Sequence, residues 1–199
     1  MLLNTGGGTV TGYGLAAAQL VRLKETGLRL TICVEQVAAS GGYMMACVAD
    51  RIVASPFAVL GSIGVITEQP NVYERLKREG VVFSTVTAGK FKRTLTPTKK
   101  VDPLDEKKLK EDIEQILNLF KGFVKTNRPS VDIDLIATGE TWFGPDALER
   151  NLVDDLKTSD TVLLEYVRDG SEVFSITYKE EKRSPLAVLN PSGAGGGWR

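Results

Sequence analysis

Apolar runs of strand length alternate along this chain with segments of helical periodicity. Residues 28–34 and 81–87 are β-branched and apolar, as in buried strands, whereas residues 13–26 are helix formers that Gly27 ends. Strands that alternate with helices predict βαβ crossovers. We therefore expect an α/β fold with a largely parallel sheet.

The other expected elements are mostly shorter. A first strand should end at Leu2-Leu3, before a run of glycines. Residues 144–156 should form a helix that ends near Asn151 and then a short strand. Further strands are expected at residues 51–55, 58–66 and 172–178, and further helices at residues 41–50, 70–79 and 158–168.

The clearest helix should begin at Asp102-Pro103, because aspartate can cap a helix and proline is favoured at its first position. Apolar residues then recur at three- and four-residue steps as far as Thr126. They are Leu109, Ile113, Ile116, Leu117, Phe120, Phe123 and Val124. Such a stripe belongs either to the core or to a contact between subunits.

Length and charge bound the class of protein. A chain of 199 residues can bury a sizeable core, and we expect one domain over residues 1–178. Residues 179–199 are charged and then rich in glycine, which is typical of a disordered tail. Twenty-five basic residues balance twenty-five acidic ones, which argues against a nucleic-acid partner.

The sequence predicts no membrane span. The most apolar region, residues 44–66, is interrupted by Asp50, Arg51 and Pro56, and the first residues lack the basic start and apolar core of a signal peptide. We expect the chain itself to be soluble. Because its first strand is entered abruptly, we also expect Met1 to begin a fragment of a longer protein.

The absence of histidine restricts the chemistry that the chain can perform. A Ser–His–Asp triad, a Cys–His pair and a His-ligated zinc site cannot be built. Cys33 and Cys47 lie inside apolar runs, so we expect two buried thiols, with no metal and no cofactor. A nucleophilic serine would need a carboxylate, or a lysine whose pKa is lowered by burial, as its base.

Ser40 lies where an apolar run breaks at the sequence AASGG and continues into a short helix. Its hydroxyl could be exposed as a nucleophile while the N–H groups that follow point at a reacting oxygen. Gly41 and Gly42 would let the backbone pass close to a substrate. The alternative is that Ser40 only caps the following helix.

A second glycine cluster, Gly6–Gly8, follows the first strand. Consecutive parallel strands end at one edge of a sheet, so this loop and Ser40 should face the same crevice. The loop could supply oxyanion amides, make a flexible turn or bind phosphate. Residues 12–17 also match a dinucleotide fingerprint, with Glu35 as its acid, but Gly12 lies several residues past the turn.

Lys92 is a candidate base because it follows the expected strand 81–87 after a glycine, in a loop that leaves the same edge of the sheet. Lys90 is its competitor, two residues away. Most lysines are solvated surface charges, and the spacing alone does not choose between these two.

Three segments resemble the signal peptide peptidase A family of membrane-associated serine–lysine peptidases, and most closely its SohB branch. They are AASGGYMMACVADRIVASPFAVLGSIGV, AGKFKR and ATGETWFGPDALERNLVDDL, and the likeness runs from about Leu2 to Lys157. The resemblance implies a fold similar to Clp protease and crotonase, built of repeated ββα units. It also implies a membrane-associated full-length protein and homo-oligomers in rings or domes.

The resemblance assigns roles to individual residues. It implies that Ser40 is the nucleophile and that Lys92, the last residue of a G-x-x-K pattern, is its base. Gly7 and Gly41 would donate the oxyanion amides, and Ser62 would orient the lysine amine.

One departure concerns the first glycine motif, which is usually Ser-Pro-Gly-Gly in the family and is Thr5-Gly6-Gly7-Gly8 here. Loss of the proline removes a fixed φ, so we expect a looser oxyanion loop.

The implied activity is hydrolysis of hydrophobic or unstructured peptides, such as signal-peptide or membrane-protein remnants, through an acyl-enzyme. Two other classes share the expected fold. One is a crotonase-type acyl-CoA enzyme that uses backbone amides without serine chemistry. The other is a degenerate, non-catalytic member that acts only in assembly.

Overall fold

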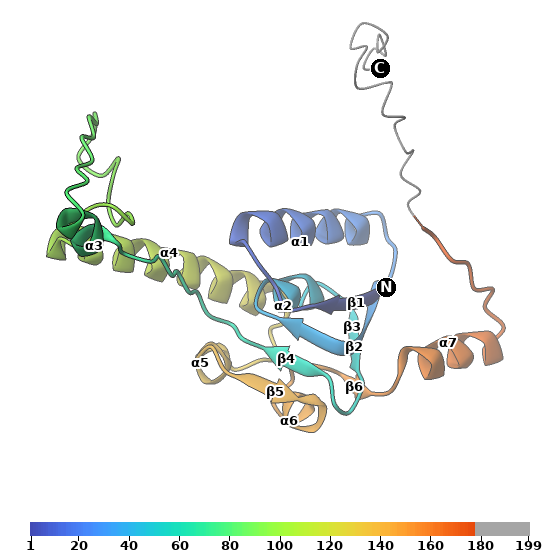
Figure 1. The fold of residues 1–199 in the computed structure, drawn as a ribbon. Coiled ribbons are helices and arrows are strands. Elements are labelled where there is room, and N and C mark those ends of the chain that lie inside the picture. Colours follow the sequence, from blue (N-terminus) through green and yellow to red (C-terminus); the bar gives the residue numbers. More distant parts are fainter. Residues whose placement is uncertain (178–199) are drawn as a thin grey trace, which may run out of the picture. The chain divides into compact units, whose positions relative to one another are not determined.

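The computed structural model describes residues 1–177, so the expected tail at residues 179–199 lies outside the described part. Within the described residues, one compact unit covers Met1–Leu164 and a second begins at Glu165. The first unit contains the whole sheet and every residue proposed above for chemistry (Figure 1).

The first unit is built on a six-stranded sheet in the order β5-β4-β2-β3-β6, with β1 also paired to β2. All pairs are parallel except β4 with β5, which confirms the expected α/β class with a largely parallel sheet. The strands are β1 (Leu2–Thr5), β2 (Thr31–Ala39), β3 (Arg51–Ala54), β4 (Val59–Gly61), β5 (Thr141–Phe143) and β6 (Asp155–Leu156).

Strand β2 is the centre of this sheet. It pairs with β1 along one side, while on its other side its first half pairs with β3 and its last three residues pair with β4. Ile32, Val34 and Ala38 are almost fully buried. Cys33 and Ala39, which point to the opposite face, are also buried, so both ends of β2 are covered on both faces, whereas Glu35 and Gln36 interrupt the apolar sequence in its middle.

Helix α2 contacts β1 and β2, helix α6 contacts β4, β5 and β6, and α1 packs on α2. The helices are α1 (Val10–Glu25), α2 (Gly41–Ala46), α3 (Tyr73–Arg78), α4 (Pro103–Asn127), α5 (Ile133–Ile136), α6 (Gly144–Glu149) and α7 (Ser159–Arg168). Within residues 1–177, none of these helices combines the length and the apolar character needed to cross a bilayer.

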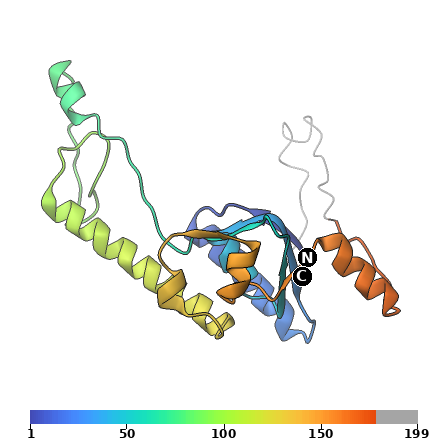
Figure 2. The ribbon, with the colours of Figure 1, turned by 90° about the horizontal axis from the view of Figure 1, so that it is seen from below.

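Helix α4 begins as expected, since the Asp102 carboxylate accepts a hydrogen bond of 2.8 Å from the Leu104 N–H. Of its apolar stripe, only Phe120 and Val124 are buried, and the members nearer its N-terminus are half-buried. Figures 1 and 2 both show α4 running outward from the sheet, with residues 66–101 gathered at its far end. Part of the stripe is therefore open to a partner.

Several element predictions were wrong. Residues 81–87, although described, form no strand, and neither do residues 172–177, while Tyr178 lies outside the described part. Val82 and Val86 are 89% and 96% exposed. No strand of the described residues pairs with this segment. High β-propensity becomes a strand only where a partner satisfies the backbone.

An ion pair between a buried arginine and a more exposed aspartate joins the end of α4 to the loop before β6. The Arg128 guanidinium donates to both oxygens of Asp154, at 2.7 and 3.0 Å, and to the Asn151 carbonyl at 2.8 Å. Asp154 also accepts the Ile52 N–H at 2.7 Å. One side-chain pair therefore connects the helix, the loop and strand β3.

We predict that Arg128→Gln lowers the free energy of unfolding by about 2 kcal/mol, since it removes the charged hydrogen bonds of a buried guanidinium, while the more exposed Asp154 stays partly solvated. Urea denaturation followed by circular dichroism measures this. The matched control is Lys121→Gln, which breaks an ion pair whose Asp134 side chain is 81% exposed. Similar losses of stability in both variants would contradict the importance of the buried arginine.

Candidate active site

Ser40 lies in the sharp turn between β2 and α2. Its N–H donates to the Gly61 carbonyl at 2.8 Å, and its own carbonyl accepts the Met44 N–H at 3.1 Å. The side chain accepts no capping hydrogen bond from α2, every residue of which is described. Ser40 therefore does not act as a simple helix cap.

The backbone of Ser40 is strained, with φ of 53° and ψ of −121°. A residue with a Cβ rarely adopts these angles, and such strain persists where the surrounding packing enforces it, often at functional sites. In this turn the Ser40 hydroxyl is not used to cap α2. A side chain held in this way can be presented to a substrate.

Gly41 and Gly42 are needed for close packing. A Cβ on Gly41 would lie 2.5 Å from Cγ of Tyr13, and a Cβ on Gly42 would lie 2.5 Å from the Thr5 carbonyl oxygen. Neither neighbour could yield without moving α1 or β1. The start of α2 thus reaches β1 and α1 only because both positions lack side chains.

The loop after β1 meets Ser40, as the shared edge of parallel strands predicts. A Cβ on Gly7 would lie 2.8 Å from both the Gly41 nitrogen and Cβ of Ser40, and Gly7 has a φ of 94°. Gly7, Ser40 and Gly41 are therefore brought together in one chain.

Ser62 is placed next to the same turn. It follows Gly61, whose carbonyl accepts the Ser40 N–H, and its own N–H donates to the Glu140 carbonyl at 2.6 Å. Ser62 also has a positive φ, 49°. Two strained serines thus end neighbouring strands, β2 and β4.

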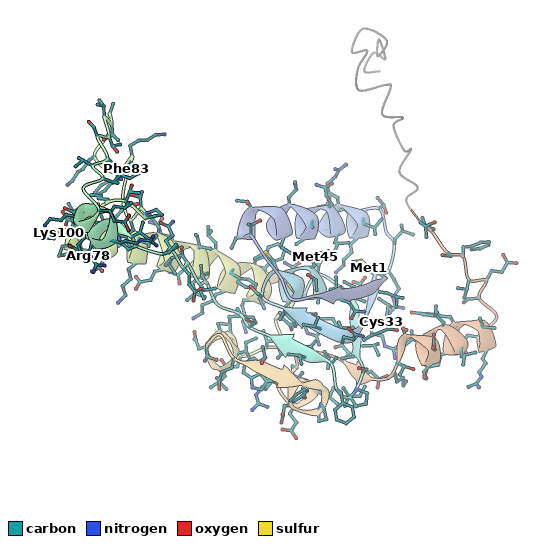
Figure 3. All side chains as sticks on the ribbon, in the orientation of Figure 1. Met1, Cys33, Met45, Arg78, Phe83 and Lys100 are labelled. Atoms are coloured by element: carbon teal, nitrogen blue, oxygen red, sulfur yellow. The ribbon has the colours of Figure 1, made fainter. Side chains whose placement is uncertain are left out.

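Lys92 is not brought to Ser40 within one chain. It is exposed, in a turn where its N–H donates to the Gly89 carbonyl at 3.1 Å. Figure 3 shows Arg78, Phe83 and Lys100, which bracket this turn in sequence, together at the far end of α4, away from Met45 in α2. Lys90 belongs to the same turn, with its amine 5.1 Å from the centre of the Phe91 ring.

The loop that carries Lys92 is held by the next residue. The Arg93 guanidinium donates to the hydroxyls of Thr85, Thr96 and Thr98, with distances of 3.0 Å to Thr96 and 2.7 Å to Thr98. Thr85 precedes the lysine and the other two follow it, so the arginine joins both arms of the loop.

The two cysteines are free and buried, which confirms the expectation of two thiols without a disulfide. Burial raises the pKa of the Cys47 thiol to about 12 and also raises the pKa of Cys33. Neither thiol is therefore a good nucleophile near neutral pH.

The dinucleotide fingerprint is not supported by the geometry. Gly12 and Gly14 lie inside α1 rather than in the turn that precedes it. The Glu35 carboxylate accepts a hydrogen bond from the Ser159 hydroxyl, so it has a structural partner.

Sequence reasoning missed Tyr13 and Thr5. The Tyr13 hydroxyl lies 2.5 Å from the Thr5 hydroxyl, and the Tyr13 ring packs on Gly41. The only signal in the sequence was an aromatic residue in the first turn of a helix that follows a glycine loop.

Comparisons with known proteins support a peptidase. A model of peptidase family S49 matches residues 22–171. The chain is 49% identical over 180 residues to the probable protease SohB of Haemophilus influenzae, covering 90% of this chain and 51% of that protein. It is 49% identical over 162 residues to the probable protease SohB of Buchnera aphidicola subsp. Acyrthosiphon pisum, covering 81% and 48%.

These matches confirm the resemblance to the SohB branch. The chain spans about half the length of the curated relatives it matches. Among solved structures, it is similar to an enoyl-CoA hydratase/isomerase from Marinobacter aquaeolei, with a TM-score of 0.44 and 14% identity over 84% of this chain and 48% of that one.

We predict that Ser40→Gly raises the free energy of unfolding by about 1 kcal/mol relative to Ser40→Ala. Both variants remove the hydroxyl, but only glycine adopts a φ of 53° without strain. Urea titrations of the two variants measure the difference. Equal stability would mean that the turn is unstrained in solution.

Proposed function

Since the chain belongs to peptidase family S49, we propose that it is the catalytic part of a serine endopeptidase with Ser40 as nucleophile and Lys92 as base. The observation that carries the proposal is the strained turn at Ser40, whose hydroxyl does not cap α2 and which lies against Gly7 and Gly41. A serine held beside two backbone amides suits acyl transfer.

In the proposed reaction, the neutral Lys92 amine accepts the Ser40 proton as Oγ attacks a peptide carbonyl carbon. The Gly7 and Gly41 N–H groups stabilise the oxyanion, and the ammonium then protonates the leaving amine. Water then attacks the carbonyl carbon of the ester on Ser40 as it gives a proton to the same lysine, and the ammonium returns that proton to Ser40 Oγ as the acid product leaves. A lysine amine serves as such a base near neutral pH only where burial excludes water from it.

We further propose that Lys92 reaches Ser40 from a second copy of the chain. The lysine is exposed, in a loop that Arg93 holds together. Phe83 and Lys100, on either side of it in sequence, lie at the far end of α4 (Figure 3). Val82 and Val86 in the same segment are 89% and 96% exposed, and Leu119 on α4 is 75% exposed. Burying these apolar side chains in a homo-oligomer would also provide the dry surroundings that the amine needs.

The remaining assignments follow from this arrangement. Ser62, beside the Ser40 turn, is proposed to hydrogen bond the arriving amine and orient it. The proposed substrates are hydrophobic or unstructured peptides, including signal-peptide and membrane-protein remnants. Membrane association of the full-length protein and assembly into a ring or dome belong to the same proposal.

We predict that Ser40→Ala and Lys92→Ala each reduce hydrolysis of a fluorogenic apolar peptide at least 1,000-fold, on the order of the effect of losing a nucleophile or its base. Circular dichroism should show an unchanged fold. Lys90→Ala is the matched control and should stay active. Full activity of Lys92→Ala would reject the base, and stabilisation by a CoA thioester without hydrolysis would favour an acyl-CoA enzyme.

A second prediction concerns assembly. Mixing the two inactive variants, Ser40→Ala and Lys92→Ala, should restore roughly a quarter of the activity after random exchange of copies. Sites with Ser40 from one copy and Lys92 from another then form by chance. If exchange is demonstrated by mass spectrometry and the mixture stays inactive, the base acts within its own chain.

A further inference from the structure

A pair of hydroxyl groups lies beneath the glycine loop at Ser40. The Thr5 hydroxyl, at the end of β1, lies 2.5 Å from the Tyr13 hydroxyl on the first turn of α1. The same Thr5 oxygen accepts the Gly7 N–H at 3.2 Å. A hydroxyl has one donor and two acceptor sites, so Thr5 can make both bonds at once.

The Tyr13 ring touches both segments that meet at Ser40. A Cβ on Gly8 would lie 2.8 Å from Cε2 of Tyr13, and a Cβ on Gly41 would lie 2.5 Å from its Cγ. The Tyr13 backbone is held in the first turn of α1, where its N–H donates to the Thr9 carbonyl at 3.1 Å, and its hydroxyl is held by Thr5. Tyr13 is thus a rigid support shared by the glycine loop and the start of α2.

Three consecutive glycines need such a support. Glycine has the greatest backbone freedom of any residue, so an unrestrained Gly6–Gly8 loop would have to be ordered each time a transition state forms. The hydroxyl pair orders it in advance by attaching Gly7 to α1 through Thr5 and Tyr13. This bears on the missing proline, whose loss predicted a looser loop.

We propose that Thr5 and Tyr13 are positioning residues for the Ser40 site. They hold the Gly7 N–H beside the nucleophile until it donates to the substrate oxygen instead of to Thr5. The inference rests on the proposed function. The developing oxyanion is charged and is therefore a stronger acceptor than a neutral hydroxyl. The Gly7 N–H passes to it while the bond between Thr5 and Tyr13 remains.

The test compares kcat and KM for a fluorogenic apolar peptide, together with the rate at which a fluorophosphonate labels Ser40. Tyr13→Phe keeps the ring and removes the hydroxyl, and Thr5→Val removes the hydroxyl at similar volume. Each should lower kcat and the labelling rate about tenfold with KM unchanged. The double variant should be no worse than the poorer single one, because the two side chains act as a unit.

Two controls separate positioning from a merely structural role. Thr5→Ser keeps the hydroxyl and should retain the wild-type kcat. Thr9 lies in the same connection between β1 and α1, and its side chain accepts no capping hydrogen bond from the described residues of α1. The kcat of Thr9→Val should therefore also equal the wild-type value.

A rescue tests the mechanism itself. Gly6 lacks a positive φ, a Cβ on it would meet no described atom within 4 Å, and it follows the extended strand β1. These features are compatible with proline, whose fixed φ would restrain the loop independently. Adding Gly6→Pro to the Tyr13→Phe variant should restore kcat. A substitution that only restored the free energy of unfolding would leave kcat low.

The outcomes are distinct for the two proposals. If Ser40→Ala abolishes labelling while Tyr13→Phe and Thr5→Val retain full kcat, or change only KM, the positioning role is overturned and the peptidase stands. If Ser40→Ala is still hydrolytically active and labelled, the proposed function itself fails.

Discussion

The close approach of two loops, after β1 and after β2, is the constraint from which the candidate site follows. Parallel pairing of these strands brings their ends to one edge of the sheet, where the Gly7 backbone lies against Ser40 and Gly41. Side chains at these glycines would collide with backbone or with Tyr13. At this contact Ser40 has a positive φ, and its side chain accepts no capping hydrogen bond from α2.

The sheet alone provides only one half of the proposed chemistry. It carries the proposed nucleophile and the two proposed oxyanion amides on buried, well-packed elements, whereas the candidate base lies on an exposed excursion at the far end of α4. The excursion has internal order of its own, since Arg93 joins its two arms. A structured loop with exposed apolar residues is typical of a surface that is completed by a partner.

The sequence predicted best those features that depend on neighbouring residues and on general rules of sheet topology. The capped start of α4, the buried cysteines and the meeting of Gly7 with Ser40 were all predicted correctly. Residues 81–87 were assigned wrongly because strand formation depends on a partner, which local propensity does not reveal. The contact between Thr5 and Tyr13 was missed because it depends on how α1 packs over the glycine loop.

The most direct test of the central claim is a crosslink between positions 40 and 92 in a mixture of isotopically distinct copies. A Ser40→Cys chain grown on heavy nitrogen is mixed with a light chain, treated with a short thiol-to-amine reagent and analysed by mass spectrometry. The account predicts heavy-to-light peptides that join position 40 to Lys92. Crosslinks found only within single chains, or only to Lys90, would contradict a site completed by a second copy.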